Sequence, residues 1–319
     1  MRYGDTGILK RAGALCFAFT FAAAAVMGMG RPDEAAAHHR SYRTSSIVMD
    51  AYSGRVYSES QADARRYPAS LTKIMTMIVT FDAIKKGKVN LDTELKVPRE
   101  ATRVAPSKLG LRTGQHIHVK QAISALIVKS ANDVAVTLAH NIGGSERSFV
   151  RMMNARAKEI GLTHTNFANA SGLFNGRQYT TARDMAKLAR HLINEYPGFY
   201  EYFSRQDFEF DGITHGTHNH LMQRYDGMDG IKTGYIQASG HNLVSSAQRD
   251  NKRMIGVIFG GHSAAERDAE MALKLDVAFA LAAENDNNPH YSQEPSIPPP
   301  DRKKGRPVRV PAARMPRRG

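Results

Sequence analysis

Ser70-Leu71-Thr72-Lys73 combines a hydroxyl that could act as a nucleophile with an amine that could take its proton. Ser130-Ala131-Asn132 adds a second hydroxyl and an amide, and Lys232-Thr233-Gly234 adds a positive charge and a third hydroxyl. One such triplet alone fits a helix cap, a solvated helix or a strand end. The three in this order predict a serine acyl-transfer site.

A serine hydroxyl is a poor nucleophile at neutral pH, so a base must remove its proton. We expect Ser70 to be the nucleophile and Lys73 its general base. Burial and a second cation such as Lys232 would lower the pKa of Lys73 from its ordinary value of about 10.4. Apolar residues recur at helical spacing from residue 74 to residue 84. Ser70 should therefore open a helix, with Lys73 one turn on along the same face.

The second triplet suits proton transfer and orientation of a substrate. The Ser130 hydroxyl can donate and accept, so it could relay a proton to the leaving amine, and the Asn132 amide could pair with a substrate amide. Two backbone N–H groups would have to stabilise the oxyanion that forms during attack. We expect them to be those of Ser70, at the helix start, and Tyr235.

The third triplet suits recognition of a carboxylate. On an edge strand, Lys232 would supply a fixed positive charge and Thr233 a hydroxyl. Gly234, which has no side chain, would let the substrate approach the backbone.

Histidines provide the main competing chemistry. His215, His218 and His220 fall within six residues and could bind zinc, as in a metallohydrolase. No acidic residue stands among them as it does in a helical His-Glu-x-x-His site, and the stretch has the composition of a loop. We therefore expect a site without metal or cofactor.

The first 37 residues have the pattern of a secretory signal. Lys10 and Arg11 precede an apolar run over residues 12–29, and small residues end at Ala37, where we expect cleavage. A retained membrane anchor is the alternative. The single cysteine, Cys16, lies in the apolar run, so the mature chain would have neither thiol nor disulfide. We expect export to the periplasm.

Residues 285–319 differ in composition from the rest. They hold eight of the thirteen prolines, and eight Lys or Arg against three Asp or Glu. This segment predicts a disordered basic tail, which contributes to a net charge of +14 for the whole chain. Export argues against nucleic acid as a partner, and the tail has no apolar face for a membrane helix.

The middle of the chain, residues 38–284, predicts one catalytic domain. Short strands over residues 46–51 and 55–58 read as a hairpin, and strands return over residues 230–235, 242–248 and 254–260. Helices are expected between them, over residues 119–129, 132–142, 145–160 and 182–195, and a last one over residues 264–283. Strands at both ends of a helical middle predict an α+β fold, an antiparallel sheet with a helical subdomain.

Longer runs around these motifs resemble the serine-type D-alanyl-D-alanine carboxypeptidases, the low-molecular-mass penicillin-binding proteins. The resemblance covers roughly residues 43–283 and is carried by residues 68–76 (PASLTKIMT), 166–173 (NFANASGL) and 229–235 (DGIKTGY). It implies a β-lactamase/transpeptidase-like fold and an acyl-enzyme on Ser70 that penicillins also form. It further implies that Arg267 helps Thr233 to hold the terminal carboxylate of a peptidoglycan pentapeptide.

Other readings stay open at this point. A β-lactamase would need a deacylating glutamate, and no Glu-x-x-Leu-Asn run lies between Asn132 and Lys232. A D,D-endopeptidase acting on cross-links would use the same site, and a wall-binding module with decayed motifs is the non-enzymatic alternative. Many family members also carry a second, β-rich domain and a C-terminal amphipathic membrane helix. Here the tail follows the catalytic part directly, which leaves membrane association undecided.

Overall fold

The computed structural model describes residues 44–286, which belong to one compact unit. The predicted signal peptide and nearly all of the predicted tail lie outside the described residues. The last helix continues to Asp286, two residues beyond the boundary expected at residue 284. Within the described part of the chain, no helix is both long and apolar enough to cross a membrane.

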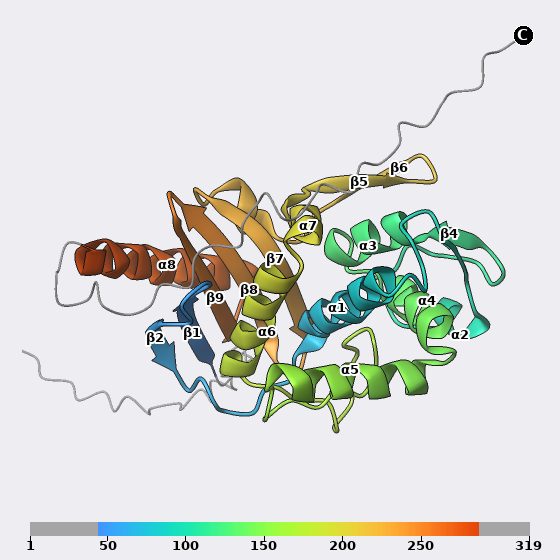
Figure 1. Ribbon diagram of the computed structural model, residues 1–319, viewed down its shortest axis with the longest axis horizontal. Coiled ribbons are helices and arrows are strands. Elements are labelled where there is room, and N and C mark those ends of the chain that lie inside the picture. Colours follow the sequence, from blue (N-terminus) through green and yellow to red (C-terminus); the bar gives the residue numbers. More distant parts are fainter. Residues whose placement is uncertain (1–43, 287–319) are drawn as a thin grey trace, which may run out of the picture. The chain divides into compact units, whose positions relative to one another are not determined.

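A five-stranded antiparallel sheet joins the two ends of this unit (Figure 1). Its strand order is β2-β1-β9-β8-β7, so that β7 forms one edge. The strands are β1 (Ser45–Asp50), β2 (Val56–Ser60), β7 (Met228–Ile236), β8 (Gly240–Arg249) and β9 (Lys252–Gly261). Two short hairpins lie outside this sheet, β3 (Glu94–Lys96) with β4 (His116–His118) and β5 (Asp207–Phe210) with β6 (Ile213–Gly216).

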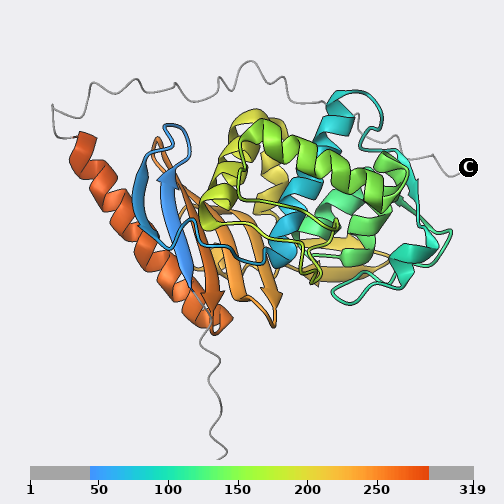
Figure 2. The same cartoon turned by 90° about the horizontal axis from the view of Figure 1, so that it is seen from below.

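Both faces of the sheet are covered, because buried apolar residues occupy successive positions along its strands. In β1, Ile47 and Met49 join the core of the helical part, whereas Val48 joins a second core against α8 (Ala264–Asp286). Successive side chains of a strand point to opposite faces, so β1 serves both layers. Figure 2 shows the sheet between α8 and the other helices.

The helical part surrounds α1 (Thr72–Lys85), eleven of whose fourteen residues are buried. A helix that is buried on all sides belongs to the core, so α1 holds its first turn in a fixed position. The other helices are α2 (Arg99–Thr102), α3 (Val119–Ile127), α4 (Asn132–Gly143), α5 (Glu146–Ile160), α6 (Ala182–Glu195) and α7 (Pro197–Tyr200), with 3₁₀ turns η1 (Ala69–Leu71), η2 (Glu201–Ser204) and η3 (His220–Gln223).

The predicted α+β architecture is confirmed, as are the first hairpin, the three later strands and the long helices. Two local predictions need correction. Ser70 does not open α1 itself but lies in η1, the 3₁₀ turn before it. The histidine stretch is not all loop, since His215 lies on β6 and His220 begins η3.

Candidate active site

Ser70 lies where the start of the central helix meets the edge strand β7. The turn η1 carries Ser70, and its neighbour Ala69 has a positive φ of 49°. Gly234 on β7 lies against this turn, so closely that a methyl group there would stand 3.1 Å from the backbone nitrogen of Ser70. The absence of a side chain at Gly234 therefore brings β7 next to Ser70.

The amine of Lys73 is fully buried and has three oxygen neighbours. Its Nζ lies 3.0 Å from Ser70 Oγ and 2.7 Å from Asn132 Oδ1, and it donates a short hydrogen bond to the Ser171 carbonyl. A neutral amine has two N–H bonds and one lone pair. The amide oxygen and the carbonyl can only accept, so in the neutral form the lone pair faces the Ser70 hydroxyl.

Electrostatics favour that neutral form. Burial, and then the positive charge of Lys232, hold the pKa of Lys73 well below its ordinary value. The negative charge of Asp133 opposes this shift. The net effect favours the neutral amine, the form that can accept a proton.

Ser130 is held in a strained position with its hydroxyl inside the site. The residue is buried and has a φ of 59°, in the left-handed region that residues with side chains seldom adopt. Within residues 44–286, its Oγ has no hydrogen-bond partner. A buried unpaired hydroxyl costs free energy, so a partner supplied by substrate would be favourable here.

Both the oxygen and the nitrogen of the Asn132 side-chain amide form hydrogen bonds within the protein. Its Oδ1 accepts from Lys73, and its Nδ2 donates to the Ala105 carbonyl at 2.9 Å. Its backbone N–H donates to the Ser107 carbonyl at 2.7 Å. One N–H of the amide stays available for a substrate, so the residue can position Lys73 and bind an acyl group at once.

Asp133 is a site component that we did not anticipate from the sequence. It is fully buried, and its carboxylate accepts from the backbone N–H groups of Leu109, Gly110 and Leu111 at 2.9–3.2 Å. These bonds fix the segment that begins at Ala105, whose carbonyl holds Asn132. The sequence feature that could have indicated this role is the acidic residue directly after the Ser-x-Asn triplet.

The contact between Ser171 and Lys73 was also not predicted. It is made by the backbone carbonyl of Ser171, a group that every residue has. The following residue, Gly172, has a φ of 86°, and a methyl group there would overlap the carbonyl oxygen of Ala69. The segment 166–173, noted above only for its family resemblance, thus packs directly on η1, the turn that carries the expected nucleophile Ser70 (the nucleophile turn).

Lys232 on β7 and Arg267 on α8 are two basic residues close enough to affect each other electrostatically. Lys232 is buried, and within residues 44–286 its ammonium group has one hydrogen bond, to the Thr233 carbonyl at 3.0 Å. Burial and the nearby Arg267 lower the pKa of Lys232 to about 7. Arg267 is itself buried and pairs with Asp268. This excess of positive charge suits an anionic group of a substrate.

Thr233 is buried beside Lys232, whereas Tyr235 lies at the outer end of the site. Tyr235 is 53 % exposed, and its ring packs against that of His241, with ring centroids 4.5 Å apart. Because β7 is an edge strand, part of its backbone has no strand partner and can face a substrate.

His215, His218 and His220, considered above as possible zinc ligands, do not form a metal site. His215 stacks on Phe208 with centroids 5.2 Å apart. Desolvation and the positive charges of Lys232 and Lys129 lower the pKa of His218 to about 4. In the region that the structure describes, no group of three or more His, Cys, Asp or Glu side chains could hold a metal ion.

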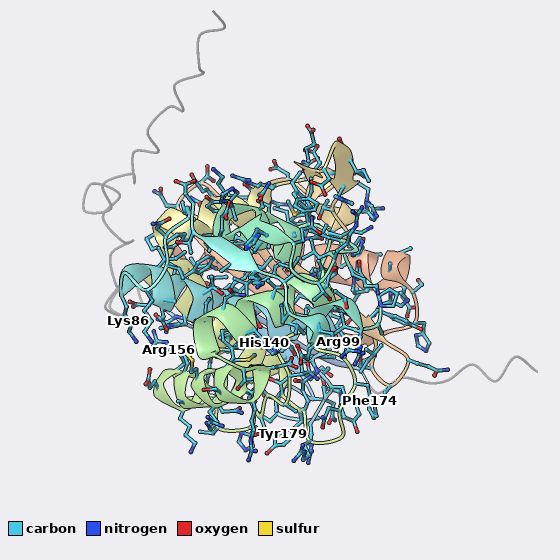
Figure 3. All side chains as sticks on the ribbon, turned by 90° about the vertical axis from the view of Figure 1, so that its right-hand side faces the viewer. Lys86, Arg99, His140, Arg156, Phe174 and Tyr179 are labelled. Atoms are coloured by element: carbon cyan, nitrogen blue, oxygen red, sulfur yellow. The ribbon has the colours of Figure 1, made fainter. Side chains whose placement is uncertain are left out.

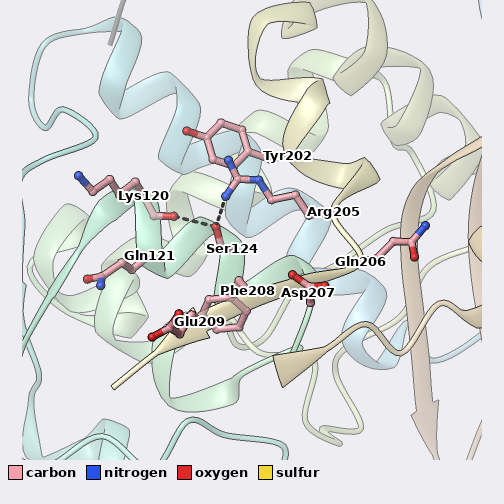
Figure 4. A pocket seen from close by; sticks show the side chains of 9 residues that line it. All are labelled: Lys120, Gln121, Ser124, Tyr202, Arg205, Gln206, Asp207, Phe208 and Glu209. Atoms are coloured by element: carbon pink, nitrogen blue, oxygen red, sulfur yellow. Dashed lines mark hydrogen bonds between the residues drawn. The ribbon is translucent and has the colours of Figure 1, made fainter. Parts of the chain in front are cut away.

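A separate hollow of about 530 Å³ lies between α3 and β5 (Figure 4). Arg205 crosses it, donating to Ser124 Oγ at 3.0 Å and packing over the Tyr202 ring. None of the predicted site residues lines this hollow.

The sequence pattern of the D-alanyl-D-alanine carboxypeptidase family matches residues 33–263. The chain therefore belongs to this family of serine-type D-Ala-D-Ala carboxypeptidases. Curated relatives include the D-alanyl-D-alanine carboxypeptidase DacF of Bacillus subtilis, 34 % identical over 82 % of this chain and 68 % of its own length. DacC of Escherichia coli is 37 % identical over 67 % of this chain and 55 % of its own length. The chain thus spans between about half and two thirds of these relatives.

Solved structures agree with this assignment. Penicillin-binding protein 5 of Haemophilus influenzae superimposes with a TM-score of 0.72 at 34 % identity, covering 75 % of this chain and 71 % of the other. Penicillin-binding protein D2 of Listeria monocytogenes, solved in its ampicillin-bound form, gives 0.68 at 28 % identity over 74 % and 96 %. The transpeptidase-like fold that the family resemblance implied is confirmed.

Proposed function

We propose that this protein is a serine D-Ala-D-Ala carboxypeptidase that removes the terminal D-alanine from peptidoglycan stem peptides through an acyl-enzyme on Ser70. The observation that carries this proposal is the buried amine of Lys73, 3.0 Å from the Ser70 hydroxyl and held on its other sides by two acceptors. Such an amine removes the proton of Ser70 as the hydroxyl attacks the penultimate carbonyl.

Expulsion of D-alanine needs a proton on its nitrogen. We assign this proton to Ser130, whose buried Oγ has no partner within residues 44–286. Its hydroxyl gives its proton to the leaving nitrogen and takes in return the proton that Lys73 removed from Ser70. Water then attacks the acyl-enzyme by the same route in reverse, with Lys73 again as the base.

Binding and charge stabilisation complete the assignment. Lys232, Thr233 and Arg267 hold the terminal carboxylate, and a bound anion would keep Lys232 protonated although its pKa is lowered in the free protein. The backbone N–H groups of Ser70 and Tyr235 are assigned to the oxyanion, which Gly234 lets approach both.

Location and further partners follow from the same proposal. The relatives that the chain matches are named for D-alanyl-D-alanine, the terminus of the proposed substrate. The signal expected in the first 37 residues would place this protein in the periplasm. Penicillins mimic the substrate carbonyl and carboxylate, so they are proposed as covalent inhibitors, with no metal or cofactor required.

The test is release of D-alanine from a purified pentapeptide stem and from diacetyl-L-Lys-D-Ala-D-Ala. The mature protein should release one equivalent, and the Ser70→Ala variant none. Cleavage of D,D-cross-linked dimers without release from the pentapeptide would replace this proposal with the endopeptidase reading.

A further inference from the structure

An exposed aromatic pair lies beside the nucleophile turn. The Phe174 side chain is 61 % exposed at the outer surface (Figure 3), and its ring meets that of Tyr67 edge to face with centroids 5.2 Å apart. Tyr67 precedes Ser70 by three residues. Phe174 follows by two residues Gly172, which packs on the backbone of Ala69. Both rings therefore belong to segments that touch the nucleophile turn.

The exposed ring is anchored by the hydrogen bonds of its own segment. The carbonyl of Leu173, one residue before Phe174, accepts from Asn169 Nδ2 at 2.9 Å and from Gln178 Nε2 at 3.3 Å. Asn169 Oδ1 accepts from the Gly172 N–H at 2.7 Å. An apolar ring that is held in place at the surface loses little conformational entropy on binding a ligand.

The position of the pair relative to the site defines which part of a substrate it can reach. Gly234 of β7 approaches the turn at the Ser70 nitrogen, whereas Gly172 approaches it at the Ala69 carbonyl. The carboxylate-binding charges lie on the β7 side, at Lys232. The acyl part of a substrate, which extends from the attacked carbonyl away from its carboxylate, can thus reach the segment that carries Phe174.

We propose that the Tyr67–Phe174 pair is an acyl-side subsite for an apolar substituent. This inference rests on the proposed function and deepens it. On a stem peptide the substituent would be the aliphatic part of the side chain preceding D-Ala-D-Ala, and on a penicillin it would be an aromatic side chain. Covering the Phe174 ring removes apolar surface from water, and ring-to-ring contact adds to that gain.

The test compares two inhibitors that differ only in this substituent. Benzylpenicillin carries a phenylacetyl group, and 6-aminopenicillanic acid has the same nucleus with a bare amine. Second-order acylation rates would be measured for wild type, Phe174→Ala and Phe174→Tyr. Leu273→Ala provides the matched control, because Leu273 is 68 % exposed on α8.

We expect Phe174→Ala to lower the benzylpenicillin rate by roughly five- to twentyfold and to change the 6-aminopenicillanic acid rate by less than about twofold. Phe174→Tyr should preserve the ratio of the two rates, and Leu273→Ala should change neither rate.

An equal fall in both rates for Phe174→Ala would show that Phe174 only supports its loop, and an unchanged benzylpenicillin rate would show that no contact exists. Either result overturns the subsite while wild-type acylation leaves the proposed function standing. A folded wild-type protein that neither compound acylates would overturn both.

Discussion

Lys73 Nζ lies 3.0 Å from Ser70 Oγ, one helical turn further along the chain, with the amine wholly buried. Arginine at this position would stay protonated and could not act as a base, because its pKa is too high. We expect Lys73→Arg to lower the acylation rate by about 10²–10⁴-fold. Lys86→Arg, at the exposed end of the same helix (Figure 3), should leave the rate unchanged. Retention of activity in Lys73→Arg would assign the base elsewhere.

The lowered pKa of Lys232 predicts a dependence of stability on pH. Between pH 7 and 10.5 this lysine is mostly neutral in the folded protein and mostly protonated in the unfolded chain. The unfolded chain then binds more protons, so the contribution of Lys232 to the free energy of unfolding increases with pH in this window, by at most about 1.4 kcal/mol per pH unit.

Denaturant titrations of wild type and Lys232→Met at pH 7 and pH 9 would measure this effect. The stability of wild type relative to the variant should increase from pH 7 to pH 9, because only wild type regains the cost of a buried charge. A difference that stays constant would mean that Lys232 titrates alike in both states.

Gly172 joins the loop of residues 166–173 to the nucleophile turn. Gly172→Ala forces a side chain into a left-handed backbone and into the Ala69 carbonyl, so it should lower the free energy of unfolding by about 2–4 kcal/mol and slow acylation. Gly176→Ala is the matched control, since a methyl group there has no neighbour within 4 Å. Thermal melts and acylation rates of both variants would decide, and equal behaviour would contradict the proposed packing.

Arg267 is proposed to bind the substrate carboxylate. Arg267→Ala should cost on the order of 1.5–3 kcal/mol in kcat/KM with a free-acid peptide. Amidating the substrate carboxylate should lower kcat/KM of wild type by a similar amount. It should lower kcat/KM of the variant by little more, because both changes remove the same interaction. Arg224→Ala controls for the shared partner, since Arg224 also pairs with Asp268 but is exposed. Fully additive losses would return Arg267 to a structural role.

Much of the site could be placed from the sequence because its groups are side chains in compact motifs. The order of the triplets and the helical period after Ser70 predict which elements converge. Ser171 could not be placed, since it acts through a backbone carbonyl that any residue possesses. Asn132 was assigned to substrate alone, because its bond to Lys73 joins residues 59 positions apart and no local pattern reports such a contact.

Small elements were missed for a related reason. Strands β3 to β6 have three or four residues each, too few to show a period of two. The 3₁₀ turn at Ser70 escaped notice because the apolar pattern begins only inside α1, while contacts with Gly172 and Gly234 shape the turn that precedes it.

The most direct test of the central claim is the site of the covalent bond. Wild-type protein would be treated with benzylpenicillin, digested with trypsin and sequenced by mass spectrometry. Cleavage after Arg66 and Lys73 yields the peptide Tyr67–Lys73, whose two hydroxyl residues besides tyrosine are Ser70 and Thr72. We predict one penicilloyl group per molecule, on Ser70, and none in Ser70→Ala. A penicilloyl group on another residue, or an unchanged level in Ser70→Ala, would contradict the account.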